Sequence, residues 1–489
     1  MSNLLAKYLA KVIKEQEKDG RLSLTHNTKV IPLSTGSLAL DYYYNGGILP
    51  RMYTFAGAEQ SGKSLCVTTI LAAAYKSGID ALIYFDAEET LNGDTMSMLF
   101  GVKDVNMLLS SRREGKTEIP QRVHIFKGNS LEGIMDSVTN IIDQLPEKVY
   151  NEEEQCWFFK FSKSDKEEKA LMETLALSID EKMTKKHGID KFVFCRDPRS
   201  KPNSSGIQAI IIIDSLASLL ADTVRDEGTT NQMALEARRF SQHLKRFVGN
   251  LNKKQVAVLT TNHVKENPNT TYGAKEYEPG GHAIKFYASV QTRLASVSSS
   301  TAGWGGAGPV FEEESVLGEG YKDRYQFKRF KLIKDKCGGG VNTTVLQRVW
   351  LEDAFGESWG FDPVLDTLEY LIHTKQLEEN RGRYKINIPA LSERSFTFKQ
   401  FKKFVLHSAM SDPRYKLTLE EFQAEFKLDT FFDLRQYCFD QLRTGEILAL
   451  KGVDVVGSNT SNTQNTNLQF NEEVDPETGE IRQIPVDQY

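Results

Sequence analysis

Apolar and polar residues are arranged along this chain in blocks that predict strands followed by helices. An apolar run at 52–56 leads into a glycine-containing loop and then into a helix that begins near Lys63. Other apolar runs predict strands at 81–85, 123–126, 207–213 and 256–261, and we expect further strands at 329–334 and 347–351. Apolar residues at helical spacing predict helices at 38–43, 130–145, 233–251 and 361–373. This alternation predicts an α/β fold with a mostly parallel central sheet flanked by helices.

Segments without this alternation divide the chain further. Residues 2–19 predict an amphipathic N-terminal helix, which has to dock on its own domain or on a neighbour. The charged and aromatic runs of 147–205 predict an insertion with its own small hairpin or helix, and a surface elaboration is favoured over a partner-binding device. We expect an N-terminal helix and strand at 1–33, an α/β core at 34–360, a small helical C-terminal domain at 361–452 and a disordered acidic tail at 453–489.

Composition excludes several classes of protein. No run of 18 apolar residues exists, so the sequence predicts no membrane span. The five cysteines are odd in number and form no C-x-x-C pair, which argues against a disulfide framework and against a zinc site. These features favour a cytoplasmic protein.

The net charge of −5 is concentrated near the C-terminus. From Val453 onward seven acidic residues accompany a single arginine, which gives this segment a net charge of −6 and leaves +1 on the rest. A nearly neutral body does not indicate nucleic-acid binding, but it is compatible with a local basic channel.

The loop after the first apolar run carries the clearest chemical signal. It has the P-loop spacing G-x-x-x-x-G-K-[ST] between a predicted strand and a predicted helix, and its residues are Gly57, Ala58, Glu59, Gln60, Ser61, Gly62, Lys63 and Ser64, followed by Leu65. Glycines allow main-chain N–H groups to turn toward a phosphate, and the positive end of the helix dipole faces the same anion. We expect Lys63 to reach the β- and γ-phosphates and Ser64 to bind Mg²⁺. The sequence therefore predicts a nucleoside triphosphate site.

Two acidic residues follow other predicted strands. Asp214 ends the most apolar strand in the chain, which is the Walker B pattern of a carboxylate that binds Mg²⁺. Glu88 follows the strand at 81–85 and is a candidate to position or deprotonate an attacking water. An acid in this position is also commonly a helix cap, so the pattern alone leaves both roles open.

Several motifs together resemble the RecA family of DNA strand-exchange ATPases over about 30–375. Beyond the P-loop, the matching segments are STGSLALD at 34–41, DAE at 86–88, IDSLA at 213–217, MALEAR at 233–238 and GGHAIKFYASV at 280–290. The resemblance implies a RecA-type core, binding of ATP and Mg²⁺, and a helical filament on single-stranded DNA with ATP between subunits. It also implies strand exchange with double-stranded DNA, loading or single-strand-binding proteins as further partners, and a bacterial or phage-infected cytoplasm.

The resemblance also assigns roles to individual residues. Glu88 matches the catalytic glutamate and Asp214 the Walker B acid, while Lys334 and Lys336 match a pair that reaches the neighbour's γ-phosphate. The segments 222–233 and 264–281 match the two DNA-binding loops. The residues that these matches assign to DNA are Met233, Arg238, Ser241, Lys245, Lys265, Gly280 and Gly281.

The chain departs from the family at two positions. His263 replaces the glutamine that senses the γ-phosphate, as in UvsX-type phage recombinases, and its hydrogen bonding should depend on pH. The family's adenine-stacking tyrosine has no equivalent in 91–100.

Other functions remain open at this stage. The chain could be a RecA-fold hexameric helicase or other ring ATPase, or a DNA-binding mediator that does not hydrolyse ATP. The acidic tail either competes with DNA for a basic channel or only maintains solubility.

Overall fold

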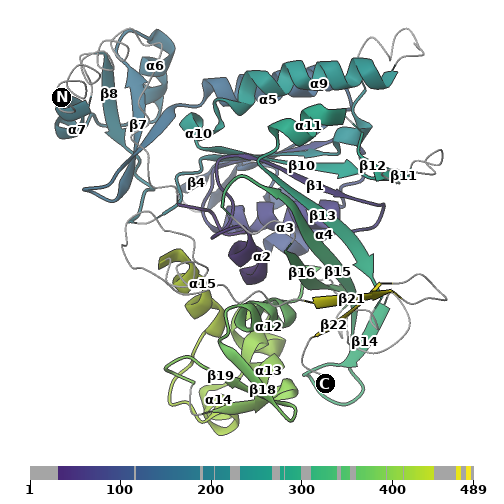
Figure 1. The fold of residues 1–489 in the computed structure, drawn as a ribbon. Coiled ribbons are helices and arrows are strands. Elements are labelled where there is room, and N and C mark those ends of the chain that lie inside the picture. Colours follow the sequence, from purple (N-terminus) through teal and green to yellow (C-terminus); the bar gives the residue numbers. More distant parts are fainter. Residues whose placement is uncertain are drawn as a thin grey trace, which may run out of the picture.

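A computed structural model places the predicted strands of the core side by side (Figure 1). The structure describes residues 31–114, 117–187, 191–202, 204–220, 232–266, 276–279, 281–298, 310–338, 343–352, 360–391, 394–410, 412–444, 470–474 and 481–485. The predicted N-terminal helix lies outside these residues, and so does most of the first predicted loop, 222–233. Among the described residues, no helix is both long and apolar enough to cross a membrane.

The central sheet confirms the predicted α/β architecture. Within the described residues its order is β17-β16-β15-β13-β1-β10-β9-β2-β5, with β14 beside β15. The strands from β13 to β5 pair in parallel, and the others add an antiparallel edge. The bounds are β1 Met52–Gly57, β2 Ala81–Asp86, β5 Val123–Lys127, β9 Ala209–Asp214, β10 Val256–His263, β13 Val290–Val297, β14 Val310–Glu314, β15 Lys322–Asp335, β16 Thr344–Glu352 and β17 Gly360–Phe361.

Helices cover both faces of the sheet because its central strands are apolar on both sides. In β9, Ile210 and Ile212 pack in one core, and Ile211 and Ile213 pack in the other. The first face carries α2 Leu38–Tyr43, α3 Lys63–Lys76 and α4 Gly93–Phe100. The opposite face carries α5 Leu131–Gln144, α9 Gln232–Val248, α10 Leu251–Lys254 and α11 Gly281–Tyr287 (Figure 1).

The parallel register brings the ends of several strands to one edge. Gly57 at the end of β1 pairs with His263 at the end of β10, and Asp86 at the end of β2 pairs with Asp214 at the end of β9. Polar residues that follow or end these strands are therefore neighbours, although up to about 200 positions separate them in sequence.

The segment predicted to be an insertion contains a small sheet with two helices. Its sheet is β6-β7-β8 and both helices are short, whereas the sequence indicated a small hairpin or helix. Their bounds are β6 Glu147–Asn151, β7 Cys156–Ser162, α6 Lys166–Thr174, α7 Glu181–His187 and β8 Phe192–Arg196. A buried ion pair joins Lys148 to Asp197 at 2.7 Å inside this segment. Trp157 and Tyr150 pack on Ile31, so the insertion also contacts the start of the described chain.

The C-terminal region is less purely helical than predicted. It contains α12 Pro363–His373, α13 Phe398–Ala409, α14 Leu419–Phe426 and α15 Leu434–Thr444, but also a small sheet of β18 Leu377–Asn380, β19 Arg383–Ile386 and β20 Ser395–Thr397. The expectation of a helical module is therefore wrong at these strands. They are short and expose most of their side chains, so they lack the apolar run that marks a buried strand.

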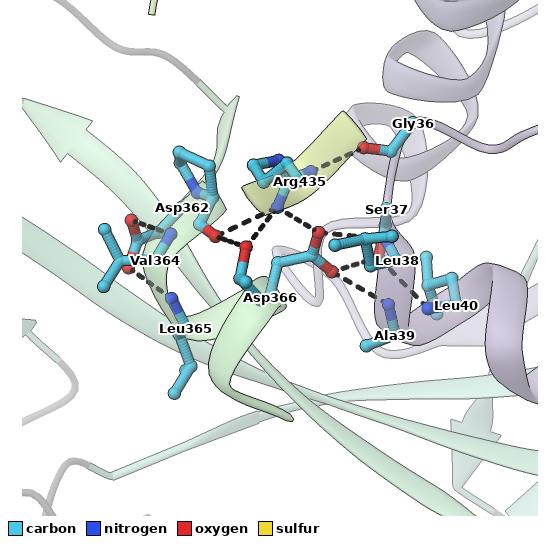
Figure 2. A network of polar contacts seen from close by, with 12 residues as sticks. Gly36, Ser37, Leu38, Ala39, Leu40, Asp362, Val364, Leu365, Asp366 and Arg435 are labelled. Carbon is cyan, nitrogen blue, oxygen red and sulfur yellow. Dashed lines mark hydrogen bonds and ion pairs between the residues drawn. The ribbon is translucent and has the colours of Figure 1, made fainter. Parts of the chain in front are cut away.

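A buried carboxylate joins this region to the core (Figure 2). Asp366 of α12 accepts hydrogen bonds from the N–H groups of Leu38 and Ala39 at the start of α2, at 2.9 and 3.2 Å. Arg435 of α15 donates to Asp366 at 2.8 Å and also to the carbonyl of Gly36 at 3.3 Å. The acid thus satisfies N–H groups that a helix start leaves free, and the arginine balances its charge.

The described structure also contains three two-stranded ribbons. They are β3 Arg112–Glu114 with β4 Thr117–Ile119, β11 Lys265–Glu266 with β12 Glu276–Tyr277, and β21 Phe470–Val474 with β22 Ile481–Pro485. The last ribbon corrects the prediction that everything after 453 is disordered. Its strands flank Asp475, Pro476 and Gly479, which are turn-forming residues, and this local signal could have indicated a hairpin.

Candidate functional site

The loop between β1 and α3 has a main-chain path that requires glycine at two positions. A Cβ atom on Gly57 would lie 2.4 Å from the carbonyl oxygen of Leu294, so a side chain does not fit there. Gly62 adopts a φ of 92° directly before α3, a conformation that favours glycine. Both glycines of the predicted motif are therefore required by the main chain.

Lys63 lies against the loop that precedes it. Its Nζ donates to the carbonyl oxygens of Ala58 at 2.7 Å and of Gly57 at 3.1 Å. Burial lowers the pKa of Lys63, and the nearby carboxylates of Glu88, Asp214 and Glu59 act in the opposite direction. Next to it, the buried Ser61 Oγ has no hydrogen-bond partner among the described residues. The loop thus holds a cation and an unused donor, both of which suit a phosphate.

Asp214 is buried at the end of β9 and is held from both neighbouring strands. The Tyr84 hydroxyl on β2 donates to Oδ2 at 2.5 Å, and the Thr261 hydroxyl on β10 donates to Oδ1. The main-chain carbonyl of Asp214 accepts from the N–H of Ala87 at 2.7 Å, next to Glu88. Sequence reasoning identified Asp214 but neither of its two hydroxyl donors.

Glu88 accepts several hydrogen bonds at one oxygen. His263 Nε2 lies 2.8 Å from Oε1, the Ser218 hydroxyl donates at 3.1 Å, and the Ser215 hydroxyl donates as well. Burial by itself would raise the pKa of Glu88, but these hydrogen bonds outweigh burial and hold the pKa below its usual range. The carboxylate is therefore ionised at neutral pH, and it contacts His263.

Lys328 of β15 is a second cation at the loop, and sequence reasoning did not identify it. Its Nζ donates to the carbonyl oxygen of Gln60 at 2.5 Å and to Ser296 Oγ at 2.8 Å. The residue is only 3% exposed. Burial is the main reason, and the charge of Lys63 a smaller one, that the pKa of Lys328 falls to about 8.

We expect the substitution Lys328→Met to remove a pH-dependent penalty from the free energy of unfolding. An unfolded lysine titrates near 10.4, so between about pH 8 and pH 10 the unfolded chain binds more protons at this position than the folded chain. Burying the charged ammonium group therefore lowers the free energy of unfolding by its full amount below about pH 8. This penalty declines as the pH rises above 8. Urea midpoints at about pH 7 and pH 9.5 should show wild type gaining stability relative to the variant. Parallel changes in the two proteins would contradict the low pKa.

The residues assigned to DNA are only partly described. Arg238, Ser241 and Lys245 lie three and four positions apart on α9, so they share one stripe, and the two cations are exposed. Two other arginines of α9, Arg239 and Arg246, contact acids of α5 instead. The main chain of Met233 lies in α9, that of Lys265 in β11 and that of Gly281 at the start of α11, whereas Gly280 lies outside the described residues.

Lys334 and Lys336 lie at the end of β15, beside the C-terminus of α11. Lys334 Nζ donates to the carbonyl oxygens of Lys285 and Phe286, and Lys336 Nζ donates to that of Phe286 at 3.3 Å. Burial, followed by the charge of Lys336, lowers the pKa of Lys334. In the single chain both ammonium groups are thus engaged by the helix that follows the second predicted DNA loop. Their role at a neighbour's phosphate stays a prediction.

Comparison with known proteins shows similarity to RecA proteins. A model of the RecA N-terminal domain matches residues 201–303, which contain β9, α9 and β10. Protein RecA of Clostridium novyi is 25% identical over 286 residues, which cover 58% of this chain and 59% of that protein. Protein RecA of Lactococcus lactis is 26% identical over 292 residues, covering 59% of this chain and 55% of the relative.

A longer alignment extends beyond the core. Protein RecA of Gloeothece citriformis is 22% identical over 388 residues, which cover 76% of this chain and 86% of that relative. The alignments with the first two relatives span somewhat more than half of each relative's length. The domain match and these relatives show that the chain is similar to RecA proteins, and the mostly parallel α/β sheet is consistent with a RecA-type domain.

Proposed function

We propose that this chain is an ATP-hydrolysing DNA recombinase, which forms a helical filament on single-stranded DNA and catalyses homologous pairing and strand exchange in recombination and repair. One observation carries the proposal above all others. The ends of β1, β9, β2 and β10 bring together a P-loop lysine, a buried aspartate, and a glutamate paired with a histidine. The part of the proposal that concerns DNA rests on the similarity to RecA proteins.

The nucleotide would be held by the loop Gly57–Leu65. Its N–H groups, the free Ser61 hydroxyl and Lys63 would bind the phosphates, which explains why this buried donor has no partner within the described structure. Ser64 and Asp214 are the proposed residues for Mg²⁺, which neutralises phosphate oxygens when it is bound. The described residues contain no group of three or more acidic, histidine or cysteine side chains around one point.

Glu88 is the proposed residue for the attacking water. Glu88 is ionised because its hydrogen bonds hold its pKa low. It lies near Asp214, because the N–H of the preceding residue, Ala87, donates to the main-chain carbonyl of Asp214. An ionised carboxylate can accept a hydrogen bond from the water and orient it toward the γ-phosphate. The contacts from Ser215, Ser218 and His263 leave Oε2 for this water.

His263 is the proposed link between Glu88 and DNA. It ends β10, and the chain continues into β11 and the second predicted DNA-binding loop. We expect His263→Gln to keep DNA-stimulated hydrolysis, because the amide of glutamine still donates a hydrogen bond to Glu88. In His263→Ala that donor is lost, so turnover should become the same with and without single-stranded DNA. Phosphate release measures both rates. Normal stimulation in the alanine variant would show that this position does not couple the two sites.

The filament part of the proposal concerns α9, α11 and the N-terminal segment. Arg238 and Lys245 would bind DNA phosphates, so affinity for single-stranded DNA should fall with salt with a slope of roughly −0.7 per phosphate contact. Lys334 and Lys336 would leave the end of α11 and approach the γ-phosphate of the neighbouring subunit. The segment 1–33 would pack on that neighbour. Loading and single-strand-binding proteins in a bacterial or phage-infected cytoplasm would be further partners.

Electron microscopy and a joint-molecule assay together test this proposal. With single-stranded DNA and a non-hydrolysable ATP analogue we expect open helical filaments. With ATP we expect joint molecules with a homologous duplex but none with a heterologous duplex of equal length. Closed rings on DNA would instead identify a ring motor. Filaments that neither hydrolyse ATP nor form joint molecules would identify a mediator, and either outcome would overturn the recombinase proposal.

A further inference from the structure

Tyr84 is a polar residue inside one of the most deeply buried strands of the sheet. It lies in the middle of β2, its ring belongs to the core between the sheet and α3, and the residue has no exposed surface. Its hydroxyl donates to Asp214 Oδ2 at 2.5 Å. A phenylalanine would fill the same space, so packing alone does not explain the hydroxyl.

Thr261 makes the corresponding contact from the other side. Its hydroxyl, also fully buried, donates to Asp214 Oδ1. Each carboxylate oxygen can accept about two hydrogen bonds or metal contacts, so each keeps one position for another partner. The two donors come from β2 and β10, the strands that also lead to Glu88 and His263. Asp214 is thus fixed against rotation about its terminal bond by both neighbouring strands.

We propose that Tyr84 is a positioning residue, which together with Thr261 orients the Asp214 carboxylate toward a divalent cation at the P-loop. This inference rests on the proposed function, since it requires Mg²⁺ to accompany the nucleotide. Groups that hold a metal-binding carboxylate by hydrogen bonds strongly affect metal affinity, because a freely rotating carboxylate presents its oxygens less often in the right direction.

The surroundings of Tyr84 suit a permanent donor. The site is closed to solvent at this side chain, so water cannot easily replace the hydroxyl after substitution. Loss of the hydroxyl should therefore act directly on the Asp214 carboxylate.

Tyr84→Phe tests the inference, with Tyr44→Phe as the matched control. Tyr44 is buried in the same core, and its hydroxyl contacts Thr292 at 2.7 Å, away from Asp214. Binding of a fluorescent, non-hydrolysable ATP analogue is titrated with Mg²⁺. For Tyr84→Phe we expect the half-saturating Mg²⁺ concentration to rise about tenfold, the low end of what loss of such a supporting contact usually causes. Affinity for the analogue without Mg²⁺ should stay as in wild type, and Tyr44→Phe should titrate as wild type does.

The other outcomes separate the inference from the proposed function. If wild type binds the analogue with Mg²⁺ and Tyr84→Phe has the same Mg²⁺ dependence, Tyr84 does not position Asp214. If wild type shows no Mg²⁺-dependent binding, the proposed function itself fails. Should Tyr84→Phe not fold, Thr261→Val removes the second donor at nearly constant volume and should raise the Mg²⁺ requirement in the same direction. An unchanged requirement in Thr261→Val would then overturn the inference.

Discussion

Lys63→Ala should reduce ATP turnover by roughly a thousandfold or more, since loss of one strong donor to developing charge typically costs 10²–10³ and Lys63 also carries a full charge. In the structure its ammonium group lies against the carbonyls of Gly57 and Ala58, and burial lowers its pKa. A polyphosphate in the loop would offset that burial. Lys63 is therefore the residue whose charge should depend most directly on the nucleotide. Phosphate release at saturating ATP measures the effect.

Lys76→Ala provides the control for this substitution. Lys76 is the last residue of α3, on the same helix as Lys63, and it is exposed. It should turn over ATP at nearly the wild-type rate. A Lys63→Ala protein that is folded by circular dichroism yet hydrolyses ATP within a few-fold of wild type would show that the loop is not the catalytic phosphate site.

Glu88→Gln should separate binding from hydrolysis. Glutamine keeps the shape of the side chain and an acceptor oxygen for Ser215 and Ser218, but it loses the charge that orients and polarises the attacking water. We expect turnover to fall by roughly 10²–10⁴, the usual range for loss of a general base, while the affinity for a non-hydrolysable ATP analogue changes little. Single-turnover hydrolysis and analogue binding measure the two effects.

The neighbouring residue is a matched control for Glu88. Glu89 is exposed and has a φ of 55°, which glutamine tolerates as well as glutamate does. Glu89→Gln should therefore hydrolyse ATP normally. Similar losses in both variants would indicate a general effect of negative charge at this edge, and the specific role of Glu88 would be wrong.

The sequence predicted those parts of the site that depend on local pattern. The apolar run of β9 ends in Asp214, that of β2 leads to Glu88, and the P-loop lies between β1 and α3. Each residue could be identified because it ends or closely follows an apolar run that predicts a strand. The parallel order of the strands then places these ends at one edge, which follows from the α/β pattern.

Contacts between distant segments could not be predicted in this way. Lys328 lies 268 positions from Gln60 in β15, which pairs with β13, β14 and β16, so nothing nearby in sequence indicates that it holds the P-loop. Asp366 caps α2 from 328 positions away. Tyr84 was visible as a polar residue in an apolar strand, but its bond to Asp214 depends on the order of β2 and β9 in the sheet.

ATP turnover with and without single-stranded DNA tests the central claim most directly. We expect slow hydrolysis by the wild-type protein alone, a large increase on addition of single-stranded DNA at low salt, and loss of that increase as the salt concentration rises. Lys63→Ala should hydrolyse ATP in neither condition. Equal wild-type rates with and without DNA would contradict the account, because the site would then be an ATPase that does not respond to the proposed substrate.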